Sequence, residues 1–153
     1  LYEASQAGVP IEIVARGICC LRPGVAGLSE TITVRSIIGR FLEHGRIYVF
    51  ANGGEFLSDK NIVMISSADL MPRNLRRRVE CFMRLENPTI RKQVLHQIMV
   101  ALLRDEKNSW YLQPDGSYVH LQTDETSFSC HEYFMSNPSL SGLGSLAGAQ
   151  DNG

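Results

Sequence analysis

The stretch that decides the fold is TITVRSIIGRFLEHGRIYVFA, residues 31–51. Its first part is rich in β-branched residues, which favour strands, so we expect a strand over Thr31–Ile38. Arg40–Glu43 is predicted to be a helical turn, and Arg46–Ala51 a second strand. Asn52-Gly53-Gly54 follows, and Asn-Gly is a strong hairpin signal because both residues readily adopt positive φ. We therefore expect the chain to turn back into a third strand over Asn61–Ser66.

The flanking residues extend this pattern in both directions. Toward the N-terminus, residues 1–7 predict a helix ending at Gly8, followed by a strand over Ile11–Val14 and a loop over residues 17–30 that is rich in Gly and Pro. Toward the C-terminus, Asn87-Pro88 favours a helix start, because Asn caps helices and Pro suits their first position. Apolar residues then keep helical spacing to about Arg104.

The remaining expected elements are a loop or turn at Met71–Asn74, a strand at Arg78–Leu85, a hairpin of Ser109–Leu112 with Ser117–Leu121 around Pro114-Asp115-Gly116, and a short helix near Glu125–Met135. This order predicts an α/β (α+β) fold in which helices flank a mixed β-sheet.

The length of 153 residues and the 44% hydrophobic content fit one globular domain, which we place at residues 1–135. Residues 136–153 are rich in Ser and Gly and are predicted to be a flexible tail. No apolar run approaches the ~18 residues of a membrane span, so we expect no transmembrane segment. The chain begins inside a predicted helix and without Met, which predicts that it is a piece of a longer protein.

The net charge of −1 is unevenly distributed. Residues 16–92 hold 13 of the 15 Lys and Arg residues but 7 of the 16 acids, and 11 of those bases are Arg. Arginine is suited to bidentate recognition of phosphate. An anion site and a solvated basic face both remain open. Aromatic residues do not alternate with these bases as a nucleic-acid stacking platform requires, so we expect no nucleic acid as partner.

Chemistry-bearing residues gather around two predicted strands. His44 lies between Arg40 and Arg46 at the entrance to one strand, and Ser66-Ser67-Ala68-Asp69 leaves another, with Asn74 beyond it. An imidazole that transfers protons at neutral pH, with Arg and hydroxyl donors beside it, would suit a phosphoryl group. The alternative is a surface histidine between two solvated arginines. No Cys or His pair has zinc spacing, and we expect no metal site in this chain.

Five segments together carry a resemblance to a known family. They are YEASQAGV at residues 2–9, VARGICCLRPG at 14–24, LSE at 28–30, VRSIIGRFLEH at 34–44 and ISSADLMPRNL at 65–75. Over about residues 1–120 the chain resembles the C-terminal part of bacterial polyphosphate kinase, the enzyme that elongates polyphosphate from ATP.

The resemblance implies a phospholipase D-like fold, in which two similar domains each contribute a His-centred motif to one site. The motif of that superfamily is H-x-K, and in this chain it is His44-Gly45-Arg46, with arginine in place of lysine. By resemblance, Arg16 contacts nucleotide phosphates, and His44 is a catalytic acid or base beside the phosphoryl group. Further expected phosphate-binding residues are Arg46, Ser66, Ser67 and Asn74, and the residues expected to guide polyphosphate are Arg35, Arg40 and Arg73.

The resemblance also places essential groups outside this chain. The phosphate-accepting histidine and the arginines that hold Mg²⁺ belong to the preceding domain, and the family strand before the first helix is expected to be missing here. ATP or ADP and polyphosphate are the implied substrates. The implied parent chain is a homo-oligomer and cytoplasmic, with peripheral membrane association left open. We expect the isolated chain to have no kinase turnover.

Two other functions stay open. A phosphodiesterase or nuclease half-domain of the phospholipase D superfamily would also use a histidine nucleophile, but Arg46 stands where its lysine is expected. A noncatalytic module would instead dock polyanions or a partner subunit through the Arg-rich middle of the chain.

Overall fold

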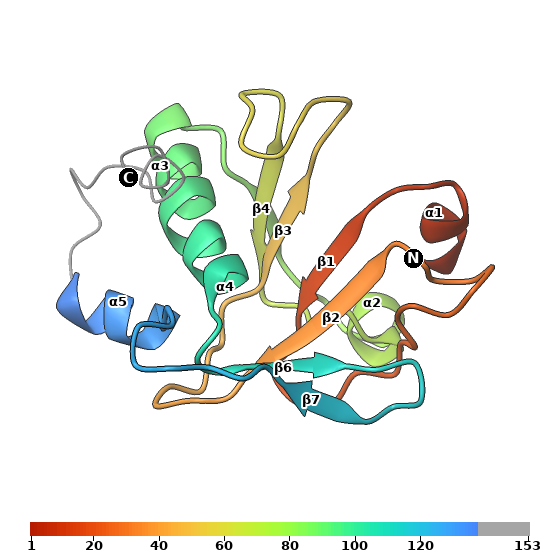
Figure 1. Cartoon of the computed structure of the whole chain (residues 1–153). Coiled ribbons are helices and arrows are strands. Elements are labelled where there is room, and N and C mark those ends of the chain that lie inside the picture. Colours follow the sequence, from red (N-terminus) through yellow and green to blue (C-terminus); the bar gives the residue numbers. More distant parts are fainter. Residues whose placement is uncertain (138–153) are drawn as a thin grey trace. The chain divides into compact units, whose positions relative to one another are not determined.

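The computed structural model describes residues 1–137, which form two compact units (Figure 1). Within these residues, the first unit comprises Leu1–Leu42 and residues 102–137, and the second comprises Glu43–Ala101. The predicted tail over 136–153 lies outside the described residues apart from its first two positions. Among the described residues, no helix has the length and apolar character needed to cross a bilayer.

The first unit contains a four-stranded sheet in the order β1-β2-β6-β7. Strands β1 and β2 are parallel, whereas β2–β6 and β6–β7 are antiparallel, so the sheet is mixed. Its elements are α1 (Tyr2–Gln6), β1 (Ile11–Val14), β2 (Ile32–Ile37), β6 (Ser109–Leu112), β7 (Tyr118–His120) and α5 (Cys130–Ser136).

Alternation of apolar side chains builds the core of this unit. Ile32 and Val34 are buried on one face of β2 and pack with Leu112 of β6. Ile11 and Ile13 of β1 contact the same cluster, because residues two apart in a strand share a face. The core therefore follows directly from the β-branched pattern of residues 31–38.

The second unit contains an antiparallel sheet in the order β3-β4-β5. A continuous helical stretch from residue 88 to 104 follows this sheet along the chain (Figure 1). The Asn87 side chain caps its start by accepting from the backbone N–H groups of Thr89 and Ile90. The elements of the second unit are β3 (Ile47–Phe50), β4 (Ile62–Ser66), α2 (Pro72–Arg77), β5 (Phe82–Arg84), α3 (Pro88–Gln93) and the π-helical η1 (Val94–Met99). The next helix, α4 (Val100–Arg104), begins in the second unit and ends in the first.

Most predicted elements are confirmed, but the strands form two sheets where one was expected. The predicted helical turn at Arg40–Glu43 is wrong, since the chain bends and then runs without helix from residue 38 to β3. In this segment Phe41 packs edge-on against the ring of His131, 5.2 Å between centroids, a contact with a residue far along the chain that local helix preferences do not signal.

Three boundaries also differ from the prediction. Met71–Asn74 was expected to be a loop, but Pro72 is the first residue of α2. The strand expected over Arg78–Leu85 shortens to β5, because the Glu80 side chain turns toward α2 and the end of β4. The last helix begins at Cys130, where the Ser129 hydroxyl caps it.

Candidate functional site

His44 lies in the non-helical segment that leads into β3, and its side chain is exposed. Within residues 1–137, its imidazole has no hydrogen-bond or ion-pair partner. The His44 carbonyl accepts a 2.6 Å hydrogen bond from Nη1 of Arg46, which holds the backbone at this position. The structure thus presents the imidazole to solvent from a backbone that is fixed by a neighbouring side chain.

Arg46 also joins the start of β3 to the residues that follow β4. Its Nε and Nη2 lie 3.0 and 2.9 Å from the same carboxylate oxygen of Asp69. Nearby, the Tyr48 hydroxyl donates to the Ala68 carbonyl at 2.9 Å. Burial, reinforced by the Asp69 carboxylate, raises the pKa of Tyr48. The Arg46 charge is therefore compensated inside the protein, and sequence reasoning had missed Asp69 as its partner.

A second carboxylate, Glu80, gathers the other polar residues of this unit. The Ser67 hydroxyl donates to Glu80 Oε2 at 2.6 Å, and the Asn74 amide donates to Oε1 at 2.8 Å. These two hydrogen bonds lower the pKa of Glu80, and Arg78 lies 3.6 Å away. The Ser66 hydroxyl donates to the Cys81 carbonyl. Glu80 was missed from the sequence, although it is the first acid after the run Arg76–Arg78.

In the second unit, Arg46 pairs with Asp69, Ser67 and Asn74 share Glu80, and Ser66 bonds the Cys81 carbonyl. The Ser67 and Asn74 donors are directed at Glu80. These contacts are typical of side chains that fix the end of a strand and the helix after it.

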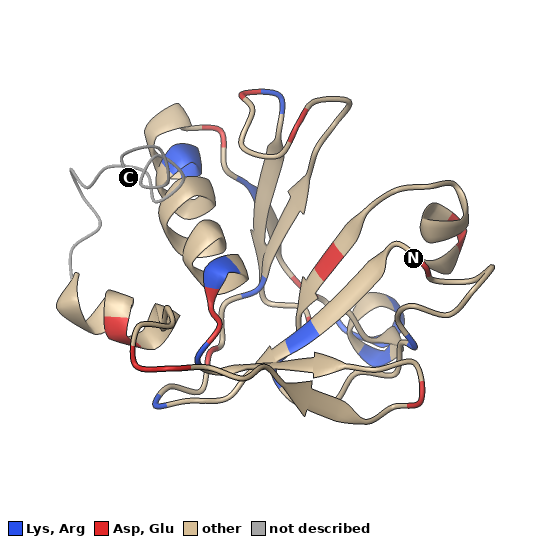
Figure 2. Cartoon of the chain, in the orientation of Figure 1, with Lys and Arg blue, Asp and Glu red and all other residues tan. Residues whose placement is uncertain are grey.

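The predicted arginines outside this cluster differ in their surroundings. Arg16 is exposed directly after β1, where Gly17 with φ +88° bends the chain. Arg40 is exposed in the bend after β2, and Arg73 is exposed on α2, which carries blue residues in Figure 2.

Arg35 is buried in the first unit. Its Nη1 donates to the Leu103 carbonyl at 2.6 Å, and its Nη2 pairs with Glu12 at 3.3 Å. The guanidinium also lies 4.9 Å from the centre of the Tyr111 ring. This environment favours a structural role for Arg35 over the guiding of polyphosphate.

An open pocket of about 640 Å³ lies in the first unit, and Gly17, the residue after Arg16, is part of its lining. Its walls come from loop residues 17–22 and from side chains of the sheet, among them Trp110 and Tyr118. This volume lies within the range of small-molecule sites. The sequence marked the loop by its Gly and Pro content but had no signal for the pocket, which needs the sheet as its second wall.

No group of three or more His, Cys, Asp and Glu side chains in residues 1–137 could hold a metal ion. That the ligands of the expected Mg²⁺ lie in a preceding domain stays a prediction.

These features define an α/β domain with a mixed sheet and with polar side chains gathered where strands begin and end. The family described as polyphosphate kinase C-terminal domain 2 has a model that matches residues 1–131. The chain belongs to this family, as the resemblance predicted.

Individual relatives agree with this assignment. A polyphosphate kinase of Erythrobacter litoralis is 61% identical over 144 residues, which are 94% of this chain and 20% of that protein. A polyphosphate kinase of Synechocystis is 56% identical over 119 residues, 78% of this chain and 16% of that protein. The chain thus spans a fifth or less of the length of these curated relatives.

The crystal structure of polyphosphate kinase from Porphyromonas gingivalis has the same fold over most of this chain. The TM-score is 0.79 at 34% identity, covering 90% of this chain and 20% of that one. The predicted α/β fold class of the polyphosphate kinase C-terminal domain is thereby confirmed.

Proposed function

We propose that the chain is the C-terminal part of a polyphosphate kinase that reversibly transfers the γ-phosphoryl group of ATP to polyphosphate. The observation that carries this proposal is the family match over residues 1–131, together with relatives named polyphosphate kinase. Transfer runs through a phosphohistidine in a preceding domain, which also supplies the Mg²⁺ ligands. ATP or ADP, polyphosphate and the preceding domains are the proposed partners, in a homo-oligomeric parent located in the cytoplasm.

Two exposed residues supply the proposed chemistry of this chain. Phosphoryl transfer depends mainly on positioning and charge stabilisation. Arg16 neutralises nucleotide phosphates, in keeping with its exposed position next to Gly17, which lines an open pocket. His44 donates or accepts a proton at the transferring group, in keeping with its exposed imidazole on a fixed backbone.

The residues around His44 have supporting roles in this proposal. Arg46 holds the His44 carbonyl and Asp69, so it positions the entrance to β3. Ser67 and Asn74 donate to the Glu80 carboxylate, and Ser66 donates to the carbonyl of Cys81, directly before β5. These contacts support positioning over direct phosphate binding for these four side chains.

The test is His44→Gln in the full-length parent, measured as ATP formation from ADP and polyphosphate. General acid–base catalysis contributes about 10²- to 10⁴-fold, so kcat should fall by that factor. His120→Gln is the matched control, because His120 lies in β7 and bonds the Lys107 carbonyl. An unchanged kcat for His44→Gln would refute the acid–base role and favour a noncatalytic module. Product release from a phosphodiester without nucleotide would favour a phosphodiesterase.

Arg16→Gln in the parent should raise KM for ADP, because the variant loses a charge-assisted contact to phosphate. The isolated chain should show no turnover, since it lacks the proposed phosphate-accepting histidine. Steady ATP formation by the isolated chain would contradict this division of labour.

A further inference from the structure

Helix α2 presents three arginines on one face. Residues 70–79 contain four arginines and no acid. Arg73, Arg76 and Arg77 stand at positions i, i+3 and i+4, which are neighbours on a helix surface. All three are exposed. We call Arg73, Arg76 and Arg77 the arginine face.

Within residues 1–137, no hydrogen bond or ion pair compensates the positive charge of these three arginines. The acids nearest in sequence are already engaged, Asp69 by Arg46 at 2.9 Å and Glu80 by Ser67 and Asn74. Like charges at this spacing destabilise a helix, so an anion bound across them would relieve a repulsion that is built into α2.

The arginine face is also held in place. Asn74, which follows Arg73 on α2, is buried and donates to Glu80, which in turn accepts from Ser67 directly after β4. Pro72 fixes the first turn of the helix. The three guanidinium groups therefore project from a helix that is anchored to the sheet of its own unit.

The ligand that suits this face is a linear chain of phosphates. Neighbouring side chains on a helix stand about 5–6 Å apart at Cβ, so a repeating polyanion can offer a separate phosphate to each of the three guanidinium groups, which one orthophosphate cannot do. Arginine binds phosphate oxygens in a bidentate manner. Residues 70–79 contain no aromatic side chain on which bases could stack, which disfavours single-stranded nucleic acid.

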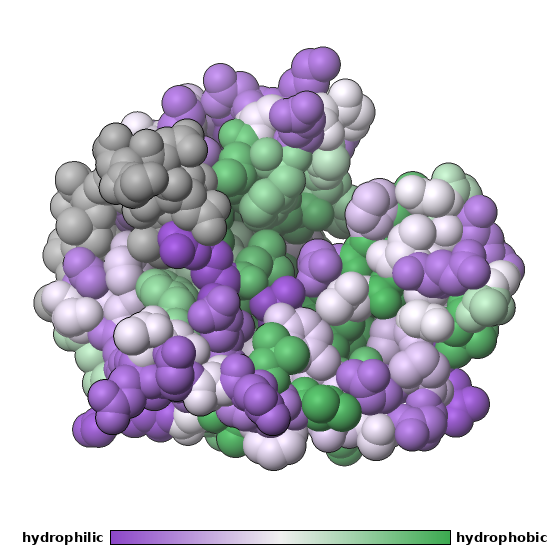
Figure 3. All heavy atoms as spheres, viewed as in Figure 1, coloured by the Kyte–Doolittle hydropathy of each residue, from purple (hydrophilic) through white to green (hydrophobic). Residues whose placement is uncertain are grey.

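The rest of the second unit offers a different surface. Figure 3 shows apolar residues over strands β3 and β4, and Phe50 at the end of β3 is 54% exposed. Leu75 is exposed too, but it is about 160° around the helix from Arg73 at the usual ~100° per residue. The arginine face is thus separate from the apolar surface of α2.

We propose that Arg73, Arg76 and Arg77 form a binding site for a stretch of polyphosphate, separate from the residues that perform phosphoryl transfer. This inference rests on the proposed function for its choice of ligand. Several linked phosphates must bind at once, so affinity should rise with polyphosphate length and fall as salt increases.

The test compares two triple variants of the full-length parent with the same change in net charge. One is Arg73→Gln/Arg76→Gln/Arg77→Gln. The control is Lys60→Gln/Arg84→Gln/Lys92→Gln, which removes three exposed cations elsewhere in the same unit. Binding of fluorescently labelled long-chain polyphosphate is followed by anisotropy at two salt concentrations, and thermal unfolding checks that both variants fold.

The arginine-face variant should weaken binding by about 3- to 100-fold, since each exposed ion pair contributes modestly, and its Kd should depend less on salt. The control should bind as the unchanged parent does. Equal losses in both variants, or no loss in the first, would overturn the proposal. An oligonucleotide of matched charge that binds the face as tightly would assign it to nucleic acid instead.

This binding measurement needs no turnover, so it stands apart from the His44→Gln test. A parent without kinase activity that still loses polyphosphate binding in the arginine-face variant would refute the proposed function and retain this site.

Discussion

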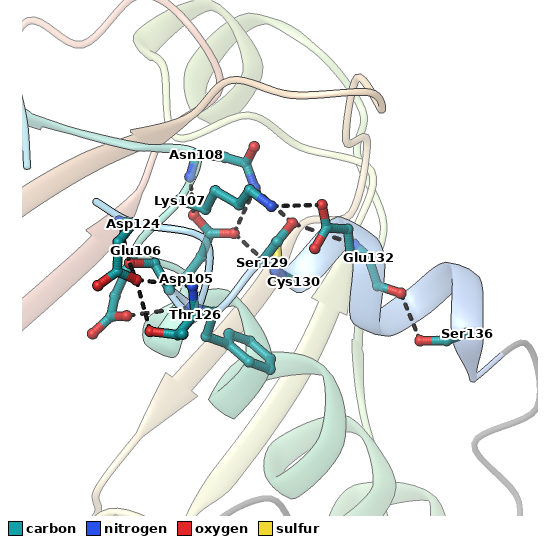
Figure 4. Close-up of polar contacts among 12 residues, drawn as sticks. Asp105, Glu106, Lys107, Asn108, Asp124, Thr126, Ser129, Cys130, Glu132 and Ser136 are labelled. Carbon is teal, nitrogen blue, oxygen red and sulfur yellow. Dashed lines mark hydrogen bonds and ion pairs between the residues drawn. The ribbon is translucent and has the colours of Figure 1, made fainter. Parts of the chain in front are cut away.

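Asp105 is the residue whose replacement should most disturb the first unit. It follows α4 and is fully buried, and its carboxylate joins the start of β6 to the start of α5 (Figure 4). Oδ1 accepts from the backbone N–H of Asn108 at 2.9 Å and from the Ser109 hydroxyl at 3.1 Å. Oδ2 accepts from the Asn108 amide at 3.0 Å and from the backbone N–H of Cys130 at 2.8 Å.

The magnitude follows from the donors that Asp105→Ala would leave without an acceptor. Two of them are buried, the Ser109 hydroxyl and the backbone N–H of Cys130. A buried donor without a partner destabilises by about 1–3 kcal/mol. The variant should therefore lower the free energy of unfolding by about 2–6 kcal/mol, a large part of the roughly 5–15 kcal/mol of a typical domain.

The assay is equilibrium urea unfolding of this chain, with Asp115→Ala as the control. Asp115 is exposed and accepts from the backbone N–H and the hydroxyl of Ser117 in the β6–β7 turn, so its loss should change stability by no more than about 0.5 kcal/mol. If Asp105→Ala were as mild as Asp115→Ala, the carboxylate would not be holding β6 and α5 together, and the reasoning would be refuted.

The same residue predicts a dependence on pH. Burial raises the pKa of Asp105, but the hydrogen bonds from Asn108 and Cys130 outweigh it and hold this pKa below its ordinary value. The stabilisation is therefore complete above the unfolded Asp value of about 3.9 and is lost as pH falls through the lower folded pKa. Asp105→Ala should show a weaker loss of stability in acid than the unchanged chain.

The remaining predictions concern single side chains. Hydrogen bonds from a serine hydroxyl and an asparagine amide lower the pKa of Glu80. The stabilisation by this carboxylate is therefore lost as pH falls below the ordinary Glu pKa. In Glu80→Gln, the melting temperature should change less between about pH 5 and 3 than it does in the unchanged chain. Asn87→Ala removes a helix cap and should lower stability by about 1 kcal/mol in urea unfolding. In Gly39→Ala the new methyl would overlap Nδ1 of buried His131, so the melting temperature should fall as overpacking destabilises by about 1–3 kcal/mol. Gly45→Ala, with nothing within 4 Å of the new methyl, should leave the melting temperature unchanged.

Elements encoded by short-range signals were predictable. The β-branched run of β2, the Asn87-Pro88 helix start and the Gly116 turn between β6 and β7 each depend on residues that are close in sequence. Their preferences come from backbone sterics and local hydrogen bonds, which do not require the rest of the chain. The turn expected at Arg40–Glu43 failed because Phe41 packs on His131, 90 positions further along.

The features of the candidate site also divide into those that the sequence predicts and those that depend on tertiary contacts. The sequence by itself determined the family, the position of Arg16 after one strand and of His44 before another, and the basic character of residues 70–79. Only the tertiary structure decided that Glu80 receives the Ser67 and Asn74 donors, and that Arg35 is buried against Glu12. A side chain's preference is local, but its hydrogen-bond partner depends on which strands pair and which helix packs beside them.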